Sequence, residues 1–233
     1  MQILRVLSIS FCFGIIFSQS VHAELGKTTL NRCDRNNAKT SVTLSTLQQG
    51  FQVNNSYTSK RLNTRSRSSR AGDFVIGLTS LESKTMIDVE GSIWDDTDTG
   101  GECFAANVKI QIIYEPIEVF IGSEFREGSC TYEAILSHEM GHVRLYQESL
   151  PKIKTIISTL INQRFSGSPI YAPKGKSRQL LETEIDTLWR PLIKSELAKV
   201  QIEQNELDTD EQINQLTWQC LGEVQSKFGF RFN

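Results

Sequence analysis

The spacing of apolar residues divides the chain into a strand-like part and a helical part. Between residues 41 and 125, segments rich in β-branched and aromatic residues alternate partly with polar ones and are separated by glycine and aspartate clusters such as "DDTDTGG". The strand-like segments are "SVTLSTL" (41–47), "DFVIGLTSL" (73–81), "TMIDVEGSIW" (85–94) and "NVKIQIIYEPIEVFIGSEF" (107–125). This pattern predicts a mostly antiparallel sheet.

Helical spacing begins after Cys130. The stretch "TYEAILSHEMGHVRLYQESL" (131–150) has apolar residues at helix intervals, and Glu133 lies near its start, where a negative charge suits the helix dipole. Pro151 indicates a break, followed by a second amphipathic helix over 152–165. A turn-rich segment (166–177) precedes a third helix over about 178–204, bent at Pro191, and Thr209 begins a further capped segment.

These elements predict one α+β domain. Its β-rich part covers residues 24–128 and its helical part covers residues 129–233. Between the strands, the segment "SKRLNTRSRSSRAGD" (59–73) carries five basic residues among serines and asparagines. A substrate contact and a solvated, mobile loop are both consistent with this composition, and the solvated loop is favoured. We assign no functional residue to it.

The first 23 residues have the features of a signal peptide. Arg5 precedes an apolar run over residues 6–17, and Val21 and Ala23 are placed like a small-residue cleavage site. The run is short for a membrane span, and no later segment approaches about 20 continuous apolar residues. We therefore expect an exported protein, periplasmic or extracellular, with no stable membrane insertion after the signal is cleaved.

The net charge and the cysteine content limit which classes of protein and which cellular compartments fit this sequence. The formal net charge is −2, which argues against a nucleic-acid-binding protein. Without the signal peptide the chain keeps an even number of cysteines, which suits two disulfides in an oxidising compartment, although three pairings are open. These cysteines are Cys33, Cys103, Cys130 and Cys220. The same chain keeps only two histidines, His138 and His142.

The two histidines lie in one short motif, "HEMGH". On a helix, side chains at i and i+4 share a face, so His138 and His142 can offer two imidazole nitrogens to one zinc ion. Glu139 is one residue further round the helix, where a general base can take a proton from a water molecule that zinc activates. The motif resembles H-E-x-x-H of the zincin metallopeptidases. An accidental match on an ordinary helix is the alternative, which the helical context and the export signal oppose.

The third zinc ligand cannot be a histidine, because none remains. Glu148 is placed like a metzincin ligand, but Leu145 stands where that arrangement needs glycine, and a continuing helix carries Glu148 about 9 Å beyond His142. The later cluster "LETEID" resembles the gluzincins. That resemblance implies that Glu182 binds zinc, with Glu184 as a rival, and that Asp186 orients the His138 imidazole.

A hydrogen-bond donor for the developing oxyanion also has to come from outside the motif. Tyr171 is the first choice, because it lies in the loop between the expected helices, and Tyr146 or an arginine is the alternative. Zincins usually bind peptide along an edge strand before the metal helix, and "IEVFIGSEF" (117–125) is placed for that role by analogy. As an ordinary core strand it would look the same.

The wider layout resembles a minimal family of predicted secreted bacterial zinc-dependent proteases. The resemblance covers residues from about Cys103 onward: a small β region, the entry into "EAILSHEMGH", and a C-terminal helix carrying "QNELDTDEQ". It implies export and hydrolysis of a peptide or protein substrate with Zn2+ as the cofactor. An exported zinc-binding protein without turnover, an interaction module, and a disulfide-stapled domain without metal are the alternatives.

Overall fold

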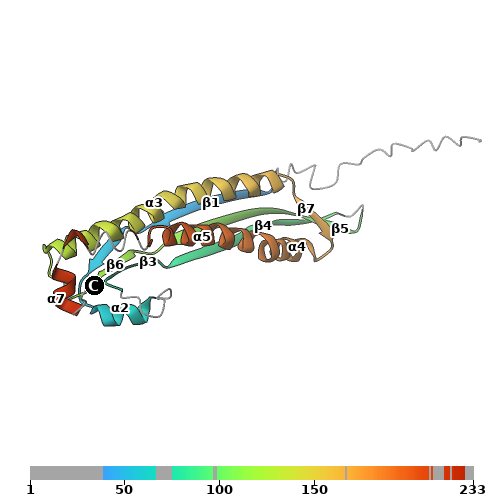
Figure 1. Cartoon of the computed structure of the whole chain (residues 1–233). Coiled ribbons are helices and arrows are strands. Elements are labelled where there is room, and N and C mark those ends of the chain that lie inside the picture. The colour runs from blue at the N-terminus through green and yellow to red at the C-terminus, as the bar shows by residue number, and fades with distance from the viewer. Residues whose placement is uncertain are drawn as a thin grey trace, which may run out of the picture. The chain divides into compact units, whose positions relative to one another are not determined.

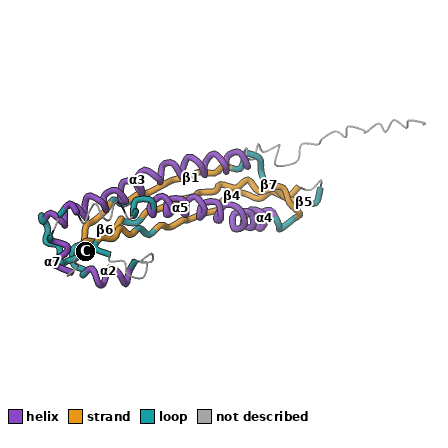
Figure 2. The backbone as a smooth tube through the Cα atoms, in the orientation of Figure 1, coloured by secondary structure: helices purple, strands orange, loops and turns teal. Residues whose placement is uncertain are grey.

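The structure is a computed structural model of the 233-residue chain, and it describes residues 39–66, 75–96, 99–165, 167–209, 211, 218–220 and 222–228. The expected signal peptide and Cys33 lie outside the described residues, as does most of the capped segment that Thr209 begins. Most strands precede the long helices, so the α+β prediction is confirmed (Figures 1 and 2).

Two sheets form the β part. The first has the order β1 (Ser41–Gln48), β5 (Gly101–Tyr114), β4 (Ser83–Asp96), with β7 (Ile170–Pro173) paired to the start of β5. The second has the order β2 (Phe51–Asn54), β6 (Ile117–Ile121), β3 (Gly77–Ser80). β4–β5, β3–β6 and β5–β7 are antiparallel, whereas β1–β5 and β2–β6 are parallel. Antiparallel pairings therefore predominate among the described strands.

One helix, α3 (Cys130–Phe165), contains both of the helices expected on either side of Pro151. The predicted break is wrong, although proline removes a backbone donor and crowds the preceding turn. Ile153, Ile157 and Ile161 are buried in the main core with residues of β5, so the apolar face that continues beyond Pro151 stabilises an unbroken helix. In Figure 1, α3 runs alongside β1, which it contacts.

The third helix is also continuous but changes its winding. α4 (Ser177–Glu184) passes into a π-helical turn, η1 (Ile185–Trp189), and then into α5 (Arg190–Asn205), with Pro191 in the first turn of α5. A π-turn relaxes the i→i−4 ladder just where proline cannot donate. The continuity matters for the site, because this helical run carries the chain back from β7 to the N-terminal half of α3.

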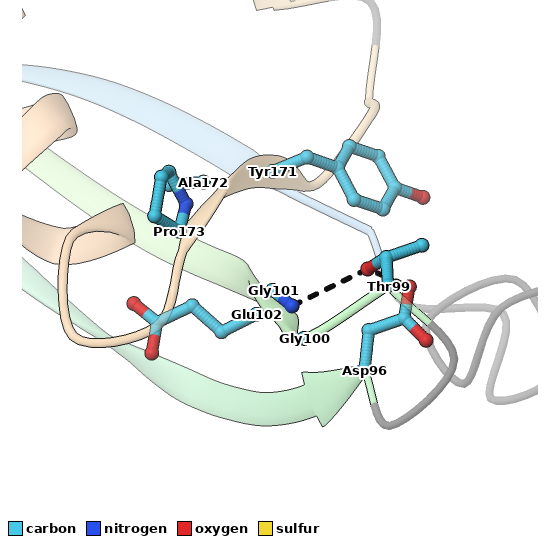
Figure 3. Close-up of a pocket in the computed structure, with 8 residues that line it drawn as sticks. All are labelled: Asp96, Thr99, Gly100, Gly101, Glu102, Tyr171, Ala172 and Pro173. Atoms are coloured by element: carbon cyan, nitrogen blue, oxygen red, sulfur yellow. Dashed lines mark hydrogen bonds between the residues drawn. The ribbon is translucent and has the colours of Figure 1, made fainter.

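Glu102 explains where α4 begins. Its buried carboxylate accepts hydrogen bonds from the backbone N–H groups of Gly175 and Ser177 and from the Ser177 hydroxyl, at 2.6–2.7 Å. The hydroxyl and then the backbone donors lower the pKa of Glu102 to about 2. This contact fixes β7 and α4 against the start of β5, in the region that Figure 3 shows.

The basic segment is partly helical. Thr58 caps the N-terminus of α2 (Ser59–Arg65), because its hydroxyl accepts a hydrogen bond from the Arg61 N–H. Leu62 of this helix is completely buried. The prediction of a solvated loop is therefore wrong for these residues, because one apolar residue at 62 anchors a helical turn. Residues 67–74 of the basic segment lie outside the described residues.

A disulfide joins Cys130, the first residue of α3, to Cys220, just before α7 (Glu223–Phe228). The Glu223 carboxylate accepts from both the backbone N–H and the hydroxyl of Thr131, at 3.0 and 2.7 Å. Cys103 is disulfide-bonded as well. No helix among the described residues has the length and apolar character needed to cross a membrane.

Candidate metal centre

α3 brings the two histidines together as its periodicity requires. His138 and His142 lie one turn apart, and their Nε2 atoms are 3.3 Å from each other. The His138 side chain is partly buried and His142 is buried, so the pair lies at the edge of the core. This geometry is consistent with the prediction that both imidazoles can bind one metal ion.

Asp208 supplies a third ligand atom. It follows α5, where the backbone N–H groups of Leu207 and Asp208 donate to the carbonyls of Gln204 and Asn205. The Asp208 Oδ1 atom lies 3.0 Å from His138 Nε2 and 3.1 Å from His142 Nε2. In a tetrahedral zinc site with bonds of about 2.0–2.1 Å, neighbouring ligand atoms are about 3.3 Å apart. The three atoms therefore fit zinc in both type and spacing.

Gln204 orients one of these ligands. Its Oε1 atom lies 2.6 Å from His142 Nδ1, and its Nε2 atom donates to the His142 carbonyl at 3.1 Å. Because an amide oxygen can only accept, the His142 Nδ1 atom carries a proton, and in the neutral ring Nε2 keeps its lone pair. Gln204 is itself buried. A buried acceptor behind the imidazole is the usual support of a metal-binding histidine.

The electrostatics hold a negative charge on Asp208. Burial alone would raise the pKa of Asp208, but hydrogen bonds from His138 and His142 lower it well below its usual range. Burial likewise opposes protonation of His142, yet the Asp208 hydrogen bond and the charge of Glu139 raise the pKa of His142. The same three atoms could hold a metal ion.

Glu139 points from α3 toward β3. Its side chain is only 5% exposed, and its Oε2 atom accepts a hydrogen bond of 2.6 Å from the Thr79 hydroxyl. Burial raises the pKa of Glu139, while the Thr79 hydrogen bond and the two neighbouring histidines partly offset the rise. The carboxylate is thus near both histidines without being a member of the ligand group.

The carboxylates that the sequence favoured as third ligand lie elsewhere. Glu182 is exposed on α4 beside Arg178, and about 30 Å of helix separates it from Gln204, which contacts His142. Glu184 accepts from the Trp189 indole and Asp186 from Arg190, so neither supports a histidine. Glu148 is exposed further along α3. Asp208 replaces Glu182 as the carboxylate beside the pair, because the helical run returns to α3 only at its C-terminal end.

Tyr171 is also distant from the histidines. It lies on β7 opposite Cys103 and is 45% exposed, beside Asp96, Thr99 and Glu102 in the cavity shown in Figure 3. Along β5, Cys103 is about 36 Å from Tyr114, whose ring contacts Tyr146. The assignment of Tyr171 as oxyanion donor is therefore corrected.

Tyr146, the alternative, lies one turn beyond His142 on the same face of α3. Its ring packs edge-on against Tyr114, with centroids 6.2 Å apart. Burial, then Tyr114, then the charge of Asp208 raise the pKa of Tyr146 to about 12. Side chains on a helix lean toward its N-terminus, which for Tyr146 is the direction of His142. The hydroxyl remains protonated and within electrostatic range of Asp208.

The strand expected to form the sheet edge is central. β6 pairs with β2 on one side and β3 on the other, so the prediction of an edge strand at 117–125 is wrong. Among the described strands, β2 and β3 are the outer strands of this sheet, and β3 contacts α3. The edge nearest the histidines therefore belongs to β3.

Sequence reasoning missed Asp208 and Gln204 as site residues. The contact between His142 and Asp208 spans 66 residues, and no local pattern encodes it. A signal was nevertheless present: Gln204, in the last turn of α5, and Asp208, three residues after the end of α5, both lie within the polar stretch "QNELDTDEQ". Within the described residues, His138, His142 and Asp208 are a group whose ligand atoms all lie within 4.8 Å of one another.

Comparisons of this chain with family models, curated proteins and solved structures found no match.

Proposed function

We propose that the protein is an exported zinc-dependent metallopeptidase with His138, His142 and Asp208 as its zinc ligands. The observation that carries the proposal is the convergence of two imidazole nitrogens and one carboxylate oxygen at 3.0–3.3 Å. Three protein ligands leave a fourth position for water or substrate, as in catalytic rather than closed structural zinc sites. The H-E-x-x-H motif on α3 supports the same reaction class.

Glu139 is the proposed general base. Zinc, when bound, polarises a carbonyl group and lowers the pKa of a water molecule. Glu139 takes the proton from the attacking water and later passes it to the leaving amine. Its burial supports this role, because a raised pKa brings a carboxylate closer to the pH at which it must both accept and release a proton.

Tyr146 is the proposed donor to the oxyanion. Its high pKa keeps the hydroxyl protonated, and a phenol that stays protonated can donate where negative charge develops on the substrate carbonyl oxygen. It follows His142 by one helical turn, so it lies on the face of α3 that carries the ligands.

An extended peptide or protein segment is the proposed substrate. β3 is an outer strand of its sheet and touches α3 at Glu139 through Thr79, so a peptide aligned along β3 would pass close to the base. Export is supported by the signal-peptide pattern of residues 1–23, and the disulfide at Cys130 and Cys220 suits an oxidising compartment.

One observation favours a second candidate, a zinc-binding protein without turnover. Glu139 is 5% exposed, so a substrate water reaches it only if the surroundings of α3 and β3 open. The two functions differ in whether the zinc-loaded wild type cleaves peptide bonds at all.

Glu139→Gln tests the proposed function. The amide cannot act as a base but keeps the shape of the side chain, so zinc content should match wild type and hydrolysis of a fluorogenic peptide library should fall at least 100-fold. Equal cleavage by the variant would exclude Glu139 as the base. Zinc-loaded wild type that cleaves no peptide in the library would favour the non-catalytic candidate.

A further inference from the structure

The outer strand β3 holds the proposed base in place from outside the metal-binding motif. The Thr79 hydroxyl lies 2.6 Å from Glu139 Oε2 and 3.3 Å from the Glu139 backbone carbonyl oxygen. The shorter contact is the hydrogen bond of ordinary length for a hydroxyl and a carboxylate. A residue of the sheet is thereby connected directly to the helix that carries both histidines.

A second residue of the same strand shapes the other carboxylate oxygen. A Cβ atom built on Gly77 would lie 2.4 Å from Glu139 Oε1 and 2.6 Å from Ile135 Cγ2, closer than atoms approach one another. Gly77 and Thr79 are two residues apart and so face the same side of β3. The strand therefore contributes a donor to Oε2 and, at Gly77, the space that Oε1 occupies.

This arrangement separates the roles of the two oxygens. A carboxylate that acts as a base needs one free oxygen, and a glutamate side chain with its three rotatable bonds can present that oxygen in several ways. With Oε2 engaged by Thr79, the carboxylate cannot rotate freely, and Oε1 is the oxygen left to accept a proton.

We infer that Thr79 is a positioning residue for hydrolysis: its hydroxyl fixes the orientation of the Glu139 carboxylate, and Gly77 provides the room for it. The inference rests on the proposed function, because it assigns Thr79 a role in the same reaction. It goes beyond the motif, since neither residue belongs to α3.

Thr79→Val and Thr79→Ser form a matched pair for the test. Valine keeps the branched shape and removes the donor, whereas serine keeps the donor and removes a methyl group. With a fluorogenic peptide that wild type cleaves, Thr79→Val should keep zinc content and KM and lower kcat at least tenfold, in the range usual for residues that support a site. Thr79→Ser should retain most of the wild-type kcat.

Two results would overturn the positioning role. One is a Thr79→Val enzyme with wild-type kcat; the other is a Thr79→Ser enzyme as impaired as Thr79→Val, because packing rather than the hydroxyl would then matter. Thermal unfolding of both zinc-loaded variants separates a kcat effect from loss of the fold. If zinc-loaded wild type cleaves no peptide, the proposed function itself fails and the positioning role fails with it.

Discussion

Tyr146 continues the face of α3 that carries His138 and His142. Its hydroxyl stays protonated because burial, Tyr114 and the Asp208 charge raise its pKa to about 12. An oxyanion donor contributes to the transition state and not to metal binding, so its loss should be visible in kcat alone.

We therefore expect Tyr146→Phe to keep the zinc content and the fold and to lower kcat about 100-fold, with little change in KM. Tyr171→Phe is the matched control, because Tyr171 lies on β7 at the start of β5 and should leave kcat unchanged. Peptide hydrolysis under saturating substrate measures both. Equal activity of Tyr146→Phe and wild type would remove Tyr146 from the reaction.

At the scale of single residues, the sequence predicts those contacts that form within one helix. The i, i+4 spacing of His138 and His142 determines that their imidazoles meet, whatever the rest of the chain does. The proposed third ligand depends instead on where a helix from a distant part of the chain ends, and Asp208 reaches the pair only through the packing of α5 on α3. Glu182 is also a carboxylate on the same helical run, but it lies about 30 Å along that run from the end that reaches the histidines.

Among the elements, α3 contains a glycine in the middle of the motif. Gly141 has no neighbour closer than 3.9 Å to the position of a Cβ atom, and the nearest atoms belong to the flexible side chains of Arg144 and Leu207. Neither a strand nor the ligand group makes a close approach there. The glycine is therefore a helix residue with an ordinary propensity cost.

Gly141→Ala should stabilise the protein by about 1 kcal/mol, the difference in helix propensity, and leave zinc content unchanged. Gly77→Ala is the contrasting variant, because its Cβ would collide with Glu139 and Ile135. Urea unfolding of the two variants measures the difference. A destabilised Gly141→Ala would mean that the motif glycine has a packing role that these distances do not explain.

The segment that carries Asp208 is attached to α3 on both sides. On the N-terminal side of Asp208, Gln204 is hydrogen-bonded to His142. On its C-terminal side, Cys220 is disulfide-bonded to Cys130. Such a tether restricts the unfolded chain and limits how far the carboxylate can move from the histidines.

Replacing both Cys130 and Cys220 by serine should lower the free energy of unfolding by about 2–5 kcal/mol. It should also weaken zinc binding, because the segment that carries Asp208 would lose its covalent link to α3. Cys103→Ser is the control, because Cys103 is disulfide-bonded but lies at the start of β5, far from Asp208, so it should destabilise without weakening zinc binding. Titration with a competing chelator gives the zinc affinities. Unchanged affinity in the double variant would mean that Gln204 alone holds the segment.

Local sequence patterns predict whether a segment is a helix or a strand better than they predict where that helix or strand ends. The strands at β1, β4 and β5 agree with alternation and β-branched content, whereas Pro151 indicated a break that packing overrides. β2 and β7 are four residues each, too short for a periodic signal, and β6 could not be recognised as central because its partners come from distant segments.

Across the whole molecule, the site depends on three separate parts of the chain. α3 contributes His138, Glu139 and His142; the end of the α5 run contributes Gln204 and Asp208; and β3 contributes Thr79. A bound zinc ion would link the helical parts, so metal should stabilise the folded protein by the free energy of binding, about 2.7 kcal/mol at 100 times Kd.

The zinc content of purified protein tests the central claim most directly, measured by atomic absorption in wild type and in His138→Ala, Asp208→Ala and Glu182→Ala. Wild type and Glu182→Ala should each hold one zinc per chain, because Glu182 is exposed beside Arg178 and remote from the histidines. His138→Ala and Asp208→Ala should lose it. Zinc retained in Asp208→Ala, or lost in Glu182→Ala, would contradict the ligand set, and no zinc in wild type after metal is supplied would contradict the metal centre.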